Sequence, residues 1–329
     1  MKQVIVPIFV PHMGCPHDCV FCNQYHITGS WQAPDLAAID EMVAEWTASS
    51  GETPSLAFYG GSFTAIDLDV QLPLLAAAAA LKAAGKIAAI RLSTRPDALD
   101  AEVLARLANY GVDTIEIGVQ SLNDDVLCAS GRGHTAQDAV AAIRRVKAAG
   151  FACGVQLMLA LPADTPARSL ATAAQVVDLA PDFVRLYPTA VIRDTALADL
   201  YASGRYVPWA MDAVLDTAAE MAMAFAAAEI PVIRIGLQAE DQLTQGDVIA
   251  GAYHPAMGEL VKARIYRKRM AIMLGAGASG PVTFAVAPRR LSQALGHHRE
   301  NVDYLSALAG VPVKIMGDET LADNEIERR

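Results

Sequence analysis

Short apolar, β-branched segments alternate with longer alanine-rich segments over the first 235 residues. The predicted strands are Val4–Val10, Ser55–Tyr59, Ala89–Ser93, Thr114–Val119, Gly154–Leu159 and Phe183–Leu186. The predicted helices between them are Leu36–Ser49, Val70–Ala84, Ala101–Tyr110, Thr135–Ala149 and Arg168–Leu179. This alternation predicts a parallel sheet with right-handed crossovers. Six such units predict an α/β fold, a partial TIM-like barrel whose chemistry lies at the C-terminal ends of the strands.

The pattern changes after a helix at Met211–Ala228 and a strand at Val232–Ile235. We expect an irregular loop over 236–257, a basic helix over 258–274 and a Gly- and Ala-rich linker over 274–281. A strand, two helices and a strand follow over 282–316. We therefore expect a core barrel over 1–235, an extension over 236–279, a small α+β module over 280–317 and a frayed acidic tail over 318–329.

Neither the apolar runs nor the N-terminus suggests membrane insertion or export. No run reaches the roughly 20 apolar residues of a membrane span. The N-terminal segment has no small-residue cleavage site, so we expect no signal peptide and no membrane partner. A cytoplasmic protein is the resulting expectation.

The charge is distributed unevenly along the chain. The net charge is −10, yet residues 260–299 hold eight Lys or Arg and no Asp or Glu. This basic segment is a candidate anion-binding face, and an ordinary solvated helix face is the alternative.

Three of the five cysteines lie within eight positions, in the order Cys15-Pro-His-Asp-Cys19-Val-Phe-Cys22. Such a cluster indicates metal binding rather than a disulfide framework. Three thiolates can hold a 4Fe–4S cluster with one iron left open for a small molecule. The alternative is a structural zinc site, whose fourth ligand would come from one of three histidines, His12, His17 or His26.

The cysteine spacing, with Phe21 before the third cysteine, resembles the signature of radical S-adenosylmethionine (SAM) enzymes. Downstream segments resemble the catalytic subunit of Elongator and its bacterial and archaeal relatives in particular. These are Tyr59-Gly60-Gly61-Ser62-Phe63, Thr94-Arg95-Pro96-Asp97, Glu116-Ile117-Gly118-Val119-Gln120-Ser121, Gly131-Arg132-Gly133-His134-Thr135, Leu186-Tyr187-Pro188-Thr189 and Val191-Ile192-Arg193-Asp194-Thr195. Together they cover about residues 3–235 in the family's order.

The resemblance implies a 4Fe–4S cluster on Cys15, Cys19 and Cys22, with SAM chelating the open iron. It implies reductive cleavage of SAM to methionine and a 5′-deoxyadenosyl radical, driven by an external donor such as a reductase, flavodoxin or ferredoxin. It assigns no catalytic side chain beyond the cofactors.

The same resemblance implies the residues that contact SAM. The expected contacts are Phe21 beside the cluster, Gly60, Gly61 and Ser62 at the methionine end, Gln120 and Gln156 near the ribose, and Arg132 at the carboxylate. For Gln156 the alternative is a strand-end hydrogen bond, for Arg132 a surface salt bridge, and Arg95 and Asp97 could pair to fix a turn.

Residues 282–316 resemble the core of a KH domain, in which a GxxG loop clamps a nucleotide backbone. Here the loop reads Gly296, His297, His298 and Arg299, with arginine in place of the second glycine. The alternative is a small structural cap.

Only 55 residues follow Leu274, so we expect no acetyltransferase-like domain of the kind that follows the radical SAM half in the Elongator subunit. We therefore do not carry over acetyl-CoA-dependent chemistry.

We therefore predict a radical SAM enzyme that modifies RNA, most simply tRNA, through the basic segment 260–299 and the KH-like loop. The alternatives are a radical SAM enzyme acting on a small molecule or peptide, and a non-catalytic metal or Fe–S RNA-binding protein.

Overall fold

The main sheet is a curled half-barrel of seven parallel strands. The computed structural model describes residues 4–10, 15, 17–22, 34–237, 246–275 and 280–329. The strand order is β1-β2-β3-β4-β5-β6-β8. Their bounds are β1 Ile5–Val10, β2 Ser55–Gly60, β3 Ile90–Thr94, β4 Thr114–Gln120, β5 Ala152–Leu159, β6 Phe183–Pro188 and β8 Val232–Ile235. The predicted partial barrel is confirmed, and β8 adds a seventh strand to the six predicted units.

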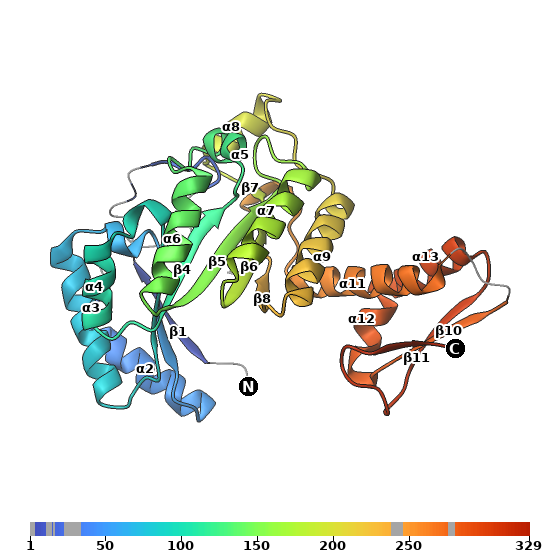
Figure 1. Cartoon of the computed structure of the whole chain (residues 1–329), viewed down its shortest axis with the longest axis horizontal. Helices are drawn as coiled ribbons and strands as arrows, with labels where there is room; N and C mark the ends of the chain where they lie inside the picture. Colours follow the sequence, from blue (N-terminus) through green and yellow to red (C-terminus); the bar gives the residue numbers. More distant parts are fainter. Residues whose placement is uncertain (1–3, 11–14, 16, 23–33, 238–245, 276–279) are drawn as a thin grey trace.

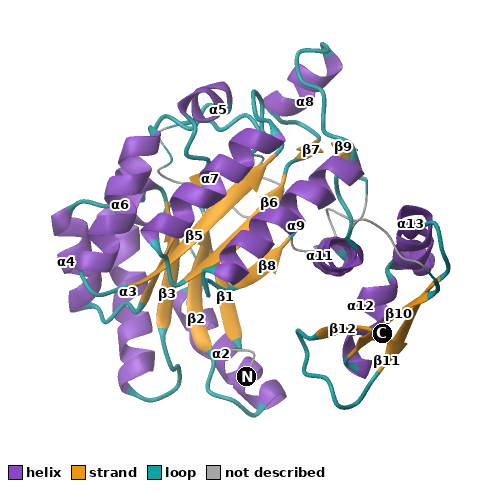
Figure 2. Cartoon of the chain, turned by 45° about the vertical axis from the view of Figure 1, so that its right-hand side comes forward, coloured by secondary structure: helices purple, strands orange, loops and turns teal. Residues whose placement is uncertain are grey.

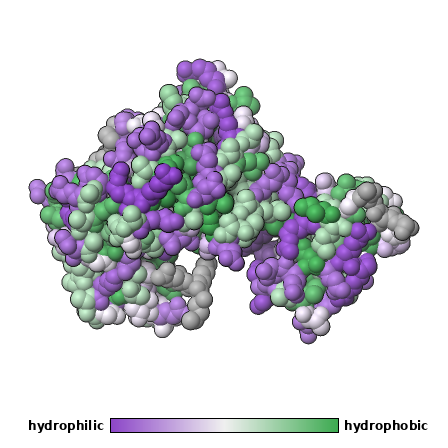
Figure 3. Space-filling model, in the orientation of Figure 1, coloured by the Kyte–Doolittle hydropathy of each residue, from purple (hydrophilic) through white to green (hydrophobic). Residues whose placement is uncertain are grey.

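The crossover helices cover one face of the sheet, as Figures 1 and 2 show for α6, α7 and α9. The helices are α2 Leu36–Ser50, α3 Leu68–Ala83, α4 Ala101–Asn109, α6 Ala136–Ala148, α7 Pro166–Leu179 and α9 Met211–Ala227. Asp35, Asp100, Thr135 and Thr165 cap four of them by accepting a backbone N–H, as short polar side chains do at helix N-termini. Figure 3 shows hydrophilic and hydrophobic surface mixed over this side of the barrel. None of the helices in the described ranges is long and apolar enough to cross a membrane.

Several short elements were missing from the sequence prediction. Two are the helices α5 (Asp124–Ala129) and α8 (Ala196–Ala202). The others are β7 (Ala190–Ile192) and β9 (Val248–Gly251), which pair antiparallel. The prediction of an irregular loop over 236–257 was therefore wrong for β9. The pairing of β7 with β9 has an irregularity between Val191 and Ile192. Over such short strands, the sequence shows too little alternation of side chains to predict them.

A second sheet lies at the C-terminal end of the chain. Its central strand β10 (Val282–Val286) pairs parallel with β11 (Val313–Gly317) and antiparallel with β12 (Ile326–Arg328). Between β10 and β11 lie the helices α12 (Leu291–Leu295) and α13 (Glu300–Ala309). The predicted strand–helix–helix–strand order is confirmed. The prediction of a frayed acidic tail was wrong, because β12 in this tail pairs with the free edge of β10. The sequence of the tail alone does not show that this edge is available.

Helix α11 (Met257–Leu274) belongs to both hydrophobic cores. Met257 and Val261 in its first turns pack into the barrel core. Met270 and Leu274 in its last turns pack with Phe284 and the rest of the C-terminal core. Figure 1 shows α11 running from the barrel to the small sheet. The two sheets are thus joined by a shared helix whose apolar residues face a different core at each end.

Inside the half-barrel, five consecutive strands each contribute one polar side chain to a single layer. Glu116 on β4 is fully buried and pairs with Arg91 on β3 at 2.8 Å and with Arg185 on β6 at 2.6 Å. Tyr59 on β2 donates to its carboxylate at 3.0 Å, and Gln156 on β5 donates at 3.3 Å. A buried carboxylate needs this many partners, because taking it from water without them costs several kcal/mol.

The ring of Phe183 lies next to this layer, on the side of the strands' N-terminal ends. Phe183 packs against the backbone of Gly154, where an added Cβ would lie 2.3 Å from the ring. The guanidinium of Arg91 lies 5.3 Å above the same ring. Close packing between β5 and β6 therefore requires glycine at position 154. Along β6, the inward-facing side chains change from the apolar Phe183 to the charged Arg185.

We expect Glu116→Gln to lower the free energy of unfolding by ~3–5 kcal/mol, because two buried guanidiniums would lose their shared anion. Glu102→Gln is the matched control. Glu102 lies 3.9 Å from Arg106 with its side chain 89% exposed, so its loss should cost at most about 0.5 kcal/mol. Urea unfolding followed by circular dichroism measures both. Equal stabilities of the two variants would contradict the role given to Glu116.

Candidate active site

The cysteine segment lies against the connection between β4 and α6. Cys15, Cys19 and Cys22 are all half-buried. The backbone N–H of Val20 donates to the Ser130 carbonyl at 3.1 Å, and the N–H of Leu197 donates to the Val20 carbonyl at 2.7 Å. The backbone of the segment is therefore held from two sides, by the turn before Gly131 and by the start of α8.

Two glycines allow this close approach. Gly131 and Gly133 both have left-handed backbone conformations, with φ of +66° and +71°. A Cβ on Gly131 would lie 2.9 Å from the Asp18 carbonyl oxygen, and one on Gly133 would lie 2.3 Å from the His17 ring. The motif Gly131-Arg132-Gly133 thus has glycine where the cysteine segment rests on its backbone.

Two guanidiniums point at one of the three thiols. Nη1 of Arg132 lies 3.2 Å from the Cys19 Sγ, and Nη1 of Arg95 lies 3.9 Å from it. Arg132 also donates to the Gly118 carbonyl at 2.5 Å, and Arg95 donates to the backbone carbonyl of Arg132. Both arginines are buried. Two buried cations thus lie beside the sulfur atom of Cys19.

The Gly60–Ser62 motif lies at the end of β2. Gly60 has φ +106°, a conformation that suits glycine. The Ser62 hydroxyl lies 2.9 Å from the Thr94 hydroxyl and accepts the Arg95 N–H at 3.2 Å. The Ser62 backbone N–H bonds to the Cys15 sulfur. Burial raises the pKa of the Cys15 thiol, and this N–H and the Arg95 guanidinium oppose the rise.

Three buried polar atoms at this edge have no hydrogen-bond partner within the described ranges. They are Gln120 Oε1, Arg132 Nε and His134 Nδ1. Gln120 also holds a left-handed conformation, with φ +67°, that is unusual for a side-chain-bearing residue. Burial and the cations Arg132 and Arg95 lower the pKa of His134 to about 4, so its ring is neutral at pH 7. Unpaired buried donors and acceptors beside three cysteines fit a polar ligand such as SAM.

Two other predicted SAM contacts have protein partners of their own. The Gln156 amide binds the side chain of Glu116 in the barrel interior, whereas the alternative had been a strand-end hydrogen bond to neighbouring backbone. Phe21 packs in a small apolar cluster with Val191, Leu197 and Tyr206. The Tyr206 hydroxyl donates to the Ala160 carbonyl at 2.6 Å. Arg95 and Asp97 do form the predicted ion pair, at 2.9 Å.

The three thiols suit the ligand set of a 4Fe–4S cluster with one open iron. Among the described residues, no group of three His, Cys, Asp or Glu side chains is arranged around one point. A 4Fe–4S cluster instead bonds each cysteine to a different iron, so the thiolates need not converge on one point. Of the candidate fourth zinc ligands, His17 packs on Gly133, while His12 and His26 lie outside the described residues.

The KH-like loop has an unusual backbone. Gly296, His298 and Arg299 all have positive φ, of +76°, +49° and +65°. The His297 and His298 rings lie 4.0 Å apart between centroids. Asn301, by contrast, is fully buried and donates to the carbonyls of Ala263 and Ala294, which ties α13 to α11 and α12.

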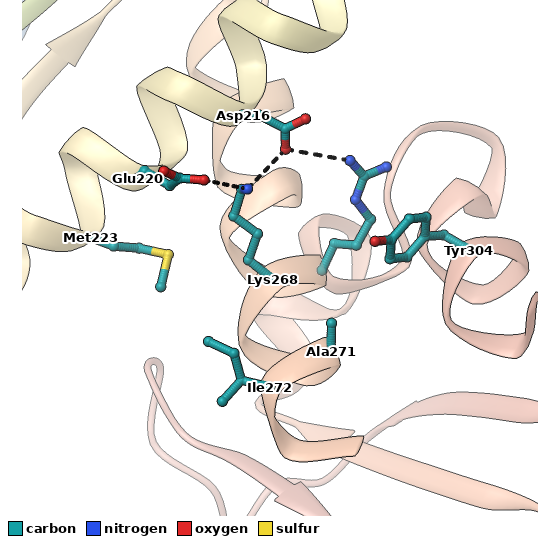
Figure 4. Close-up of a pocket in the computed structure, with 8 residues that line it drawn as sticks. Asp216, Glu220, Met223, Lys268, Ala271, Ile272 and Tyr304 are labelled. Atoms are coloured by element: carbon teal, nitrogen blue, oxygen red, sulfur yellow. Dashed lines mark hydrogen bonds and ion pairs between the residues drawn. The ribbon is translucent and has the colours of Figure 1, made fainter. Parts of the chain in front are cut away.

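Most of the basic segment 260–299 is paired with acidic residues. Arg264 pairs with Asp212 and Asp216 of α9 at 2.5 and 2.9 Å, and Figure 4 shows Lys268 reaching between Asp216 and Glu220. Lys262 pairs with Glu259, and Asp323 of the tail pairs with both Arg289 and Arg290. Except for Glu259, these partners lie far from the segment in sequence, so the sequence alone overstated its free positive charge.

The paired residues of α9 and α11 line a surface pocket together with α13. Its volume is about 610 Å³. Arg267 lines it and stacks on the Tyr304 ring at 4.4 Å. The charges around the pocket balance, so it does not replace the expected anion-binding face.

The sequence reading missed the barrel interior. Arg91, Glu116 and Arg185 were given no role, although each is a charged residue within an apolar strand. That violation of the apolar pattern is the signal that could have identified them, because a charge on a buried strand requires a partner.

Comparison with known proteins connects this geometry to one family. The radical SAM superfamily matches residues 9–176, and the C-terminal domain of radical SAM proteins matches residues 181–267. The tRNA uridine(34) acetyltransferase of Dehalococcoides mccartyi is 24% identical over 240 residues, 62% of this chain and 52% of that protein. Elongator complex protein 3 of Danio rerio is 31% identical over 183 residues, 55% of this chain and 32% of that protein. The alignments thus span about half and a third of these relatives.

A solved structure agrees with the fold. Archaeal Elp3 of Methanocaldococcus infernus superposes with a TM-score of 0.65 at 18% identity, over 82% of this chain and 63% of that one. At this identity the likeness shows the half-barrel architecture and no more.

We expect Gly131→Ala to reduce iron incorporation severalfold, because its Cβ would displace the backbone at Asp18. Gly150→Ala is the matched control. Gly150 is also left-handed, with φ +85°, but an added Cβ meets nothing within 4 Å. Each variant carries the backbone strain of about 1 kcal/mol. Iron and sulfide analysis after anaerobic reconstitution distinguishes them. Full iron content in Gly131→Ala would show that the cysteine segment does not depend on this contact.

Proposed function

Because the chain belongs to the radical SAM superfamily, whose enzymes use a 4Fe–4S cluster and SAM, we propose that Cys15, Cys19 and Cys22 hold the cluster and that the enzyme modifies RNA, most simply tRNA. The observation that carries the first part is the convergence of Arg132 and Arg95 on Cys19 at the open edge of the barrel. The RNA substrate is supported by the relatives named for tRNA modification and for Elongator.

Residues of the strand ends would bind and orient SAM. Arg132 Nε, buried and unpaired, is a donor for the SAM carboxylate, and a guanidinium matches that group in geometry. The unpaired Gln120 Oε1 is an acceptor for a ribose hydroxyl. The backbone at Gly60 and Gly61 can approach the amino group because no side chain intervenes. Gln156 is given no contact to SAM, because its amide already binds Glu116 in the barrel interior.

When bound, the cluster and SAM would supply the bond-breaking chemistry, the reductive cleavage of SAM with an electron from an external donor such as a reductase, flavodoxin or ferredoxin. The chain itself holds the reactants in place and keeps water out. The substrate would meet SAM at the strand ends, beside the cysteine segment.

The KH-like loop is the proposed contact to the RNA backbone. Among described residues, Arg299 has no carboxylate partner, unlike most other cations of the basic segment. Its left-handed φ of +65° costs about 1 kcal/mol relative to glycine. A strained arginine at the tip of a loop is consistent with a role in binding rather than in folding.

One observation favours a second candidate, a small-molecule substrate in the same barrel. The pairing of Arg264, Lys268, Arg289 and Arg290 with carboxylates leaves a smaller cationic surface than the sequence suggests. Nucleoside mass spectrometry on RNA from a deletion strain and its complemented parent separates the candidates. Loss of one modified nucleoside supports RNA, and an unchanged profile favours the small molecule.

We expect the reconstituted protein to convert SAM and dithionite to 5′-deoxyadenosine, and Cys19→Ser to lose this activity by at least 100-fold. Cys128→Ser is the matched control, because Cys128 is exposed and outside the triad. Liquid chromatography of the reaction mixture measures the product. Wild-type levels of product from Cys19→Ser would refute the ligand assignment.

We expect Arg299→Gly to raise the free energy of unfolding by about 0.5–1 kcal/mol, because glycine adopts the left-handed conformation without strain. The same change should weaken tRNA binding and reduce its salt slope by about one. Arg299→Ala is the control that removes the charge and keeps the strain. Filter binding across a salt series and thermal unfolding measure the two effects. Unchanged tRNA binding in both variants would remove the loop from the RNA interface.

A further inference from the structure

Two arginines lie side by side on the last two strands of the half-barrel. Arg185 on β6 is the register partner of Arg234 on β8. The β6–β8 register is irregular between Val184 and Arg185, so register alone does not place the Arg234 side chain. Arg234 lies close enough to Tyr187 of β6 for its charge to act on the Tyr187 hydroxyl, which places it on the inner face with Arg185. Tyr187 follows Arg185 by two positions on β6, so it projects from that face as well, closer to the C-terminal edge. Arg185, Tyr187 and Arg234 thus form a continuous row on the interior wall.

The charge of this interior is unbalanced within the described residues. Three guanidiniums, those of Arg91, Arg185 and Arg234, share one carboxylate, that of Glu116. Arg91 and Arg185 already saturate Glu116 with contacts of 2.6–3.2 Å. Arg234 donates from Nε to the Gly236 carbonyl at 3.2 Å. Among the described residues, none accepts a hydrogen bond from its two terminal nitrogens, so these nitrogens can bind a ligand.

The neighbouring phenols add donors. Burial raises the pKa of the Tyr187 hydroxyl, and the Arg185 and Arg234 guanidiniums offset this only in part. Burial and Glu116 raise the pKa of Tyr59 as well. Both hydroxyls are thus protonated at neutral pH. Among the described residues, this wall of guanidiniums and phenols therefore has more hydrogen-bond donors than its one paired carboxylate can accept.

We propose that Arg185, Tyr187 and Arg234 form an oxyanion site inside the barrel, which binds a carboxylate or phosphate group of the substrate. Guanidinium pairs recognise both groups with two parallel hydrogen bonds. The row runs along β6 towards the strand ends where Gln120 and Arg132 leave unpaired atoms. A substrate anchored there by its anionic group would present its other end to the SAM site. The inference rests on the radical SAM part of the proposed function and is independent of the RNA part.

The test is isothermal titration calorimetry of the anaerobically reconstituted full chain at constant ionic strength. The probes are malonate, as a carboxylate, and inorganic phosphate. We expect at least one of them to bind, and Arg234→Gln to weaken it by roughly 10–100-fold, the effect of losing a charged hydrogen bond. Tighter binding of phosphate would point to a nucleotide source, and tighter binding of malonate to a separate carboxylate substrate.

Two variants keep the test interpretable. Arg234→Lys retains the charge and should retain part of the affinity, whereas Arg144→Gln removes an exposed arginine of α6 and should leave binding unchanged. Equal affinity of the wild type and Arg234→Gln, or no binding of either probe, overturns the oxyanion site. If the wild type binds an anion probe but does not bind tRNA, only the RNA proposal is overturned. The two failures are therefore distinguishable.

Discussion

The buried carboxylate of Glu116 is the interaction on which the half-barrel depends. Tyr59, Arg91, Gln156 and Arg185 reach it from β2, β3, β5 and β6, so five adjacent strands are tied at one level. Side chains from the two sides of a curled sheet can meet at one point only if the curvature is right. The network therefore constrains the curl, and it makes the interior polar where a closed barrel would be filled by branched apolar residues. A polar interior is what a substrate and a cofactor with polar groups require.

The edge above this layer is organised by a second set of constraints. Gly131 and Gly133 let the cysteine segment rest on the β4–α6 connection, while Arg132 between them turns its guanidinium to Cys19. One short motif thus positions both the backbone and the charge of the proposed cluster site. The unpaired atoms of Gln120, Arg132 and His134 lie on the same edge, so the strand ends combine a rigid cradle with unused hydrogen-bonding capacity.

The barrel, the cysteine triad and the glycine motifs could be predicted because each depends on local pattern. Alternating strands and helices follow from hydrophobic periodicity, and cysteine spacing needs no tertiary information. The partners of charged residues could not be predicted, because Arg264 meets Asp212 and Asp216 only when α11 packs on α9. The strand β12 depends in the same way on the free edge of β10. A run of basic residues is thus a weak predictor of a free cationic face.

The central claim is that three cysteines hold a cluster whose fourth iron binds SAM. Electron paramagnetic resonance of the anaerobically reduced protein, recorded before and after addition of SAM, tests it most directly. We expect a reduced-cluster signal whose g-values shift when SAM binds to the open iron. A signal that SAM leaves unchanged, or a protein that holds zinc and shows no cluster signal, would contradict it.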